Sequence, residues 1–81
     1  MFLHIGKDVI IKNKDIIGIF NLEYIKNTKE YKSMYNDLTE KKDILNVSDE
    51  CEKSFILTEN DKKIKGYITK IGTSTITKRL I

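Results

Sequence analysis

Short apolar runs near both ends of the chain enclose one segment whose apolar residues have helical spacing. The stretch 15–22 is the most apolar run, and because it is short and rich in β-branched and aromatic residues, we expect a buried strand at the centre of a sheet. The runs 2–5 and 9–11 predict two further strands, with Gly6 in the turn between them. Both faces of these strands are apolar. This pattern predicts a sheet covered by a helix on one face and by a second subunit on the other.

The middle of the chain has the spacing of an amphipathic helix, which we place at about residues 28–42. Asn27 is the expected N-cap, with Glu30 completing a capping box three residues later. Lys41 and Lys42 in the last turn complement the helix dipole. The apolar stripe, which we expect to cover the sheet rather than to bind a ligand, consists of Tyr31, Met34, Tyr35 and Leu38.

The second half of the chain returns to strand spacing. Residues 44–47 indicate a short edge strand, and residues 53–58 and 63–69 indicate a hairpin whose turn centres on Asn60-Asp61. A short helix ends the chain. The sequence thus predicts a single α+β domain over residues 1–81: a mainly antiparallel sheet, one amphipathic helix packed on it and a short C-terminal helix.

Two details of this half bear on function. Within the second hairpin strand, Lys63, Lys65 and Tyr67 alternate with apolar residues, so their common face is available to solvent, phosphate or a partner. Ser74 is the expected N-cap of the final helix over residues 75–80. The last turn of that helix is basic.

The distribution of charge is more informative than its total. The chain has 15 basic and 12 acidic residues, but Arg79 is the only arginine, and base-reading surfaces prefer the arginine fork. Residues 49–61 carry five acidic residues against one lysine, whereas residues 62–81 carry six basic residues and no acidic one. An acidic block followed by a basic block indicates that the basic part faces nucleic acid or the acidic segment of a neighbouring copy.

Residues for catalysis or metal binding are sparse. His4 is the only histidine and Cys51 the only cysteine, and they lack the spacing of zinc ligands. A Cys51/His4 nucleophilic pair would require the fold to bring them together, and a lone strand histidine is more often structural than a general base. The four glycines form no phosphate-binding loop. We therefore expect no enzymatic activity, no cofactor and no metal.

Length and cysteine content suggest where the protein acts and with what. A domain of 81 residues buries only roughly 60–65% of the surface that its unfolded chain exposes, so a thin core and a homo-oligomer are expected. One cysteine fits a reducing cytoplasm. No apolar run approaches the ~20 residues of a membrane span, and no secretory leader is evident. We expect a soluble cytoplasmic protein without a membrane partner.

Four segments in a fixed order resemble the Rem family of bacterial extracellular-matrix regulators, and most closely its RemB (YaaB) branch. In that branch an N-terminal hIhIG, a DIIGIF-like strand, a KSxxxT strand and an SSTLKKR-like C-terminal element recur. The corresponding segments, which span nearly the whole chain, are 2–6, 15–20, 53–58 and 74–79.

The resemblance implies a small non-enzymatic regulator of matrix and biofilm genes. The related RemA branch is implied to bind DNA as ring-shaped homo-oligomers whose subunits are LytTR-like. Its DNA-contacting arginines lie near the start of the DIIGIF-equivalent strand and in the turn before the KSxxxT-equivalent strand. In this chain Asp15 stands near the first position and the acidic segment 49–52 occupies the second.

Two functional hypotheses remain open. The first is an oligomeric DNA-binding transcriptional regulator, and the second is an oligomeric interaction module in which the acidic segment 49–52 faces basic residues within 62–79 of the next subunit. RNA binding is a distant third, because Tyr67 alone is too little for a stacking platform. The predicted DNA-binding residues are Lys12, Lys14, Lys53, Lys63, Lys65, Lys78 and Arg79.

Overall fold

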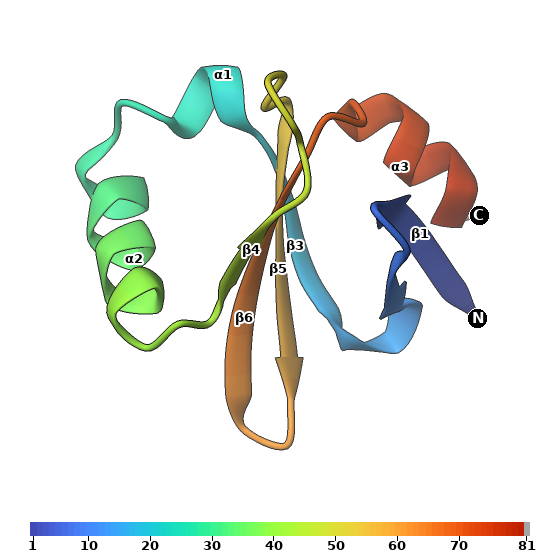
Figure 1. Cartoon of the computed structure of the whole chain (residues 1–81), viewed down its shortest axis with the longest axis horizontal. Coiled ribbons are helices and arrows are strands. Elements are labelled where there is room, and N and C mark those ends of the chain that lie inside the picture. The colour runs from blue at the N-terminus through green and yellow to red at the C-terminus, as the bar shows by residue number, and fades with distance from the viewer. Residues whose placement is uncertain (81) are drawn as a thin grey trace.

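A four-stranded sheet stands at the centre of the molecule (Figure 1). The structure is a computed structural model that describes residues 1–80. The sheet has the order β3-β5-β6-β4, formed by β3 (Ile16–Asn21), β5 (Ser54–Asn60), β6 (Lys63–Thr69) and β4 (Ile44–Asn46). β5 runs antiparallel to both of its neighbours, while β4 is parallel to β6. The predicted α+β class with a mainly antiparallel sheet and a β4 edge strand is confirmed.

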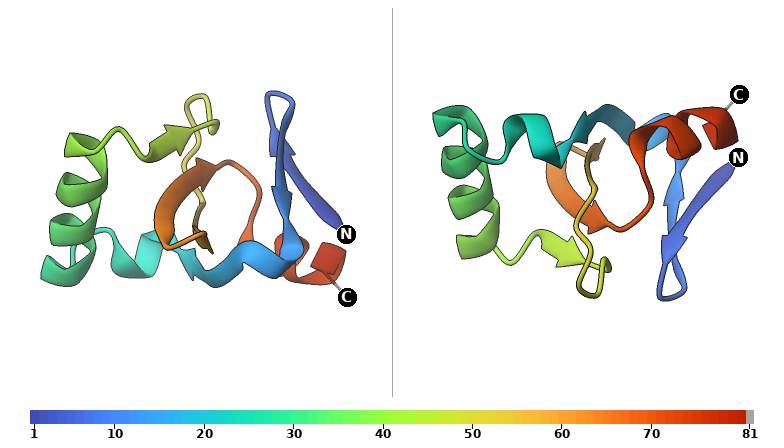
Figure 2. Two further views of the ribbon diagram at one scale, coloured as in Figure 1. Left: turned by 90° about the horizontal axis from the view of Figure 1, so that it is seen from below. Right: turned by 90° about the horizontal axis from the view of Figure 1, so that it is seen from above.

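Different parts of the chain cover the two faces of this sheet (Figure 2). They are β1 (Phe2–Gly6), β2 (Val9–Lys12), the 3-10 turn η1 (Asn13–Asp15), α1 (Leu22–Ile25), α2 (Lys29–Glu40) and α3 (Thr73–Leu80). The β1-β2 hairpin and α3 lie on one face, and α2 lies on the other. The face that we expected a second subunit to cover is therefore covered by the chain itself. Strands that are apolar on both faces need no oligomer to explain them.

The central strand is β5 rather than the apolar run 15–22. β3, which contains most of that run, lies at the edge of the sheet and has no fully buried residue. In β5, Phe55 and Ile56 are both 0% exposed and point to opposite faces. The prediction of a buried central strand at 15–22 was wrong because apolar content measures side-chain burial, whereas the order of strands depends on which edges pair.

Each face of the sheet has its own core. The first core lies under β1, β2 and α3 and contains Leu3, Ile5, Ile11, Val47, Ile56 and Ile76. The second lies under α1 and α2 and contains Leu22, Leu38, Phe55 and Ile68. Tyr67 is half-buried and packs against the first core, so Lys63 and Lys65 are the exposed residues of the Lys/Tyr face of β6.

The predicted apolar stripe of α2 does cover the sheet, but the helix begins and ends at other residues than expected. Tyr31, Met34 and Tyr35 pack with the buried Leu38 against the second core. The hydroxyl of Thr28 accepts a hydrogen bond from the Tyr31 N–H at 3.1 Å, so Thr28 and not Asn27 is the N-cap of α2. Asn27 and Glu30 therefore form no capping box.

Three further boundaries differ from the prediction. α2 ends at Glu40, which leaves Lys41 and Lys42 beyond its last turn. The β5-β6 turn centres on Asp61-Lys62, both with positive φ, one residue later than expected. α3 begins at Thr73, so Ser74 lies inside its first turn instead of capping it. Within residues 1–80, no helix is long and apolar enough to cross a membrane.

A buried hydroxyl ties the β1-β2 hairpin to the sheet. Thr69, the last residue of β6, is fully buried and donates a hydrogen bond to the Ile5 carbonyl oxygen at 2.7 Å. The same hydroxyl accepts a hydrogen bond from the Ile71 N–H at 3.2 Å. One side chain therefore satisfies a backbone acceptor of β1 and a backbone donor of the chain leading to α3.

Replacing Thr69 by valine should lower the free energy of unfolding by roughly 1–3 kcal/mol, because a buried carbonyl oxygen and a partly buried N–H would lose their partner while the side-chain shape remains nearly the same. Urea denaturation measures this change. The matched control is Thr77→Val, which removes an exposed hydroxyl that donates to the Thr73 carbonyl oxygen at 2.8 Å. That variant should change stability by less than about 0.5 kcal/mol. Equal losses in the two variants would contradict the role of Thr69.

Candidate nucleic-acid interface

A basic groove lies between β2 and the β5-β6 hairpin, on the face of the sheet that carries the first core. Its volume is about 330 Å³. It forms because the β1-β2 hairpin covers the upper part of the two long strands and leaves their turn end exposed (Figure 1). Its lining residues are Ile10, Ile11, Lys12, Asp15, Thr58, Asn60, Lys63, Lys65 and Tyr67.

Strand geometry brings the lysines of this groove together from distant parts of the chain. Lys63 and Lys65 project from the same face of β6, because alternate residues of a strand share a face. Lys12 ends β2 and faces them across the groove. All three side chains are exposed, so their ammonium groups remain hydrated and can meet an anion without a large desolvation cost.

Acidic groups reduce the positive charge of the groove only in part. Lys63 forms an ion pair with Asp43 at 3.3 Å, and the Asp43 side chain is only 12% exposed. Asp15 accepts a hydrogen bond from the Asn60 side-chain amide at 3.1 Å. Among the residues that the structure describes, neither Lys12 nor Lys65 has an ion-pair partner. These two lysines are the groups best placed to contact a phosphate.

The other predicted DNA-binding residues lie elsewhere. Lys14 belongs to η1, close in sequence to the groove but not among its lining residues. Lys53 precedes β5 at the opposite end of the sheet, about 20 Å from Lys63 by strand length. Lys78 and Arg79 end α3, where a guanidinium nitrogen of Arg79 donates to the His4 carbonyl oxygen at 3.2 Å. The structure therefore brings three of the seven predicted residues together in the groove, and the remaining four are not among its lining residues.

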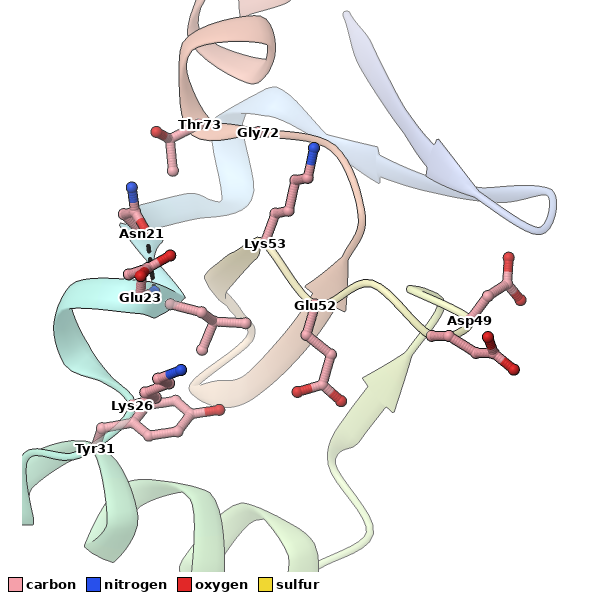
Figure 3. A pocket seen from close by; sticks show the side chains of 11 residues that line it. Asn21, Glu23, Lys26, Tyr31, Asp49, Glu52, Lys53, Gly72 and Thr73 are labelled. Carbon is pink, nitrogen blue, oxygen red and sulfur yellow. Dashed lines mark hydrogen bonds between the residues drawn. The ribbon is translucent and has the colours of Figure 1, made fainter.

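A second hollow of about 530 Å³ lies at the far end of the sheet (Figure 3). Four acidic residues line it, against two lysines. In the figure, Lys53 extends toward the start of α3, while Glu52 extends the other way, toward Tyr31. The charged residues are Glu23, Lys26, Asp49, Glu50, Glu52 and Lys53.

The carboxylates of the 49–52 segment are held in place. Asp49 forms ion pairs with Lys7 at 2.9 Å and with Lys70 at 3.6 Å, and the hydrogen bond from Lys7 lowers the pKa of Asp49 below its usual value. Glu52 accepts a hydrogen bond from the Asn46 side chain at 2.8 Å. Lys7 and Lys70 offset the charge of Asp49, so the negative charge of this end of the sheet comes from Glu23, Glu50 and Glu52, which have no ion pair within residues 1–80. Such carboxylates disfavour a nucleic-acid backbone.

Neither candidate for nucleophilic chemistry lies in these hollows. His4 is exposed on β1, and Cys51 is exposed in the loop before β5. Within residues 1–80, no three or more His, Cys, Asp and Glu side chains are grouped so that they could hold a metal ion. The polar residues that sequence reasoning missed are Thr58 and Asn60. The pairing of β5 with β6 places them opposite Lys65 and Lys63, a register that the predicted turn at Asn60-Asp61 did not give.

A model of the RemA-like family, described as extracellular matrix regulatory protein A-like, matches residues 2–80. The chain belongs to this family. No curated protein matches the chain. The resemblance to the family of matrix regulators is thereby confirmed, while the assignment to the RemB branch stays a prediction.

The resemblance implies two DNA-contact positions in the RemA branch, and the structure shows where the corresponding residues of this chain lie. Asp15 lies beside the basic groove, and the 49–52 segment lies at the acidic hollow. These positions are at opposite ends of β3 and β5, because Ile16 pairs with Thr58 and Asn21 with Ser54. In this RemA-like chain one end of the sheet is basic and the other carries the acidic segment.

The hydroxyl of Tyr31, beside the acidic hollow, gives a pH-dependent test of the site. Burial raises the pKa of Tyr31 to about 12, and the nearby Tyr35 and Glu52 add to the effect. The folded chain then binds this proton more tightly than the unfolded chain, in which a tyrosine has a pKa of about 10. The resulting stability is fully present below pH 10 and is lost as the pH rises toward 12.

We predict that Tyr31→Phe removes the highest-pH step from the tyrosinate absorbance titration near 295 nm. In urea denaturation, the stability of the native chain relative to that of Tyr31→Phe should fall between pH 10 and pH 12. The other tyrosines are common to both proteins and cancel in this difference. A difference that stays constant across this window would show that Tyr31 is not packed as described.

Proposed function

We propose that this RemA-like protein is a homo-oligomeric, non-enzymatic transcriptional regulator of extracellular-matrix genes that binds DNA through the basic groove. Membership of the RemA-like family supports the regulatory role. The observation that carries the DNA contact is the pair of exposed lysines, Lys12 and Lys65, which lack ion-pair partners within residues 1–80 and face the same groove. Action in the cytoplasm and the RemB-like branch are part of this proposal.

The groove suits the phosphate backbone better than base edges. Lysine offers a compact, mobile charge, whereas reading of bases relies mainly on side chains with paired, directional groups. The exposed Asn60 adds a neutral hydrogen-bonding group beside the lysines, of the kind that commonly contacts phosphate and sugar. A single groove would therefore bind DNA weakly and with a strong dependence on salt concentration.

Several copies acting together would make this weak contact sufficient. Linked sites convert the second binding event into an intramolecular one and raise the overall affinity without new contacts. Contacts from Lys14, next to the groove, and from Lys53, Lys78 and Arg79 on other copies could then meet the same duplex. The LytTR-like arrangement implied by the resemblance belongs to this same proposal.

The Lys12→Gln/Lys65→Gln double variant tests the groove. Fluorescence anisotropy with a labelled 30-base-pair duplex of mixed sequence, measured over a series of salt concentrations, gives the slope of log K against log salt. Each lost phosphate contact lowers the magnitude of this slope by about 0.9, so the double variant should lower it by about 1.8 and weaken binding at low salt.

The matched control is Lys29→Gln/Lys32→Gln, which removes the same charge from exposed positions of α2 on the other face of the sheet. This control should leave the salt slope within error of the native value. Equal losses in the two variants would show that only net charge matters and would contradict binding at the groove.

The second candidate is an oligomeric interaction module that does not bind DNA. The observation that favours it is the separation of charge along the sheet, with the exposed acidic segment 49–52 at one end and exposed Lys62, Lys63 and Lys65 at the other. In this case the native chain would not bind the duplex even at low salt. Its oligomers would instead dissociate when Glu50 and Glu52 are replaced by lysine.

A further inference from the structure

Lys63 differs from the other two lysines of the basic groove because its ammonium group has a carboxylate partner. Its Nζ lies 3.3 Å from a carboxylate oxygen of Asp43, whereas Lys12 and Lys65 have no ion pair within residues 1–80. Asp43 is not among the residues that line the groove. It lines a separate hollow beside α2, which Lys63 also lines. Lys63 therefore borders two hollows, and its ion pair lies outside the basic one.

The structure fixes the position of the Asp43 carboxylate. Asp43 stands in the short link between α2 and β4 (Figure 1). Its N–H donates a hydrogen bond to the Leu38 carbonyl oxygen at 2.9 Å, and its own carbonyl oxygen accepts one from the Gly66 N–H at 2.9 Å. The backbone of Asp43 is thus bound to α2 on one side and to β6 on the other.

Burial of this carboxylate opposes the departure of Lys63. The Asp43 side chain is only 12% exposed, although that of Lys63 is 61% exposed. A carboxylate that is largely removed from water is costly to leave without a counter-charge. Salt also screens a partly buried pair less than a pair between two exposed groups. A phosphate that attracts Lys63 must therefore compete with a carboxylate that is already in place.

A second ion pair shows what an exposed carboxylate would provide instead. Lys41 lies 3.2 Å from Asp37, a distance close to that of the first pair, but the two side chains are 62% and 60% exposed. Pairs of this exposed kind contribute little to stability and separate easily. The two pairs differ in the burial of the carboxylate, and this difference provides a matched control.

We propose that Asp43 is a positioning residue that withholds Lys63 from DNA, so that the groove contacts phosphates through Lys12 and Lys65 and not through Lys63. This inference rests on the proposed function and concerns the strength of the same groove. Its consequence is that the charge of Asp43 limits the affinity of each copy. Removing that charge makes a third cation available to the DNA backbone.

Asp43→Asn tests the inference, because it removes the charge while keeping the side-chain size and both backbone hydrogen bonds. With the same 30-base-pair duplex, the magnitude of the slope of log K against log salt should rise by about 0.9, the value of one additional phosphate contact. Binding at about 50 mM salt should become about tenfold tighter. Circular dichroism checks that the variant is folded.

Lys63→Gln, made in two backgrounds, separates this effect from a change in net charge. In the native chain it should leave the salt slope within error, because Lys63 makes no phosphate contact there. In the Asp43→Asn chain it should lower the slope by about 0.9 and restore the native value. The control Asp37→Asn, which removes the same charge from the exposed pair, should not change the slope.

A spectroscopic measurement on the native chain does not depend on any variant. In protein labelled with ¹³C-lysine, addition of the duplex at low salt should shift the Cε signals of Lys12 and Lys65 but not that of Lys63. In Asp43→Asn all three signals should shift. A merely structural role of Asp43 would not change which lysine side chains respond to DNA.

The outcomes distinguish this inference from the proposed function. A duplex that binds neither the native chain nor Asp43→Asn would overturn both. Binding by the native chain with the same salt slope in Asp43→Asn would overturn the role of Asp43 alone. A shift of the Lys63 signal as large as that of Lys65 in the native chain would do the same, and DNA binding at the groove would stand.

Discussion

β5 pairs on both of its edges and is buried on both of its faces. The remaining elements provide the neighbouring strands and the apolar covers that this strand requires. Phe55 and Ile56 are neighbours in the chain, yet each needs a separate apolar cover because successive strand residues point in opposite directions. α2 supplies one cover, and the β1-β2 hairpin with α3 supplies the other. The sheet therefore divides the core of this 81-residue chain into two thin halves.

This layered arrangement leaves the ends of the sheet as the places where charge can act. At the turn end, Lys12 and Lys65 face a groove without fixed carboxylate partners within residues 1–80. At the other end, Glu23, Glu50 and Glu52 line the acidic hollow without ion pairs within residues 1–80. A nucleic-acid backbone is attracted to the first end and repelled from the second. The proposed function therefore places the DNA contact away from the 49–52 segment, where the family resemblance would place part of it.

Sequence patterns predicted the elements well because local chemistry determines them. The runs at 2–5 and 9–11 became β1 and β2, and the helical stripe became α2. The patterns could not give the order of the strands, because the apolar run at 15–22 does not reveal that only one of its edges is paired. The sequence patterns did not reveal the groove for a similar reason. Lys12 and Lys65 come together only when the β1-β2 hairpin packs on β6, and this packing cannot be read from local residue spacing.

The central claim is that DNA contacts the turn end of the sheet and not the acidic end. Two-dimensional NMR of ¹⁵N-labelled protein, titrated with a short DNA duplex at low salt, tests this claim residue by residue. The account predicts that amide shifts change at residues 10–15 and 58–65, while those of residues 49–53 stay constant. Shift changes concentrated at 49–53 and at the start of α3, with none around Lys12 and Lys65, would contradict it.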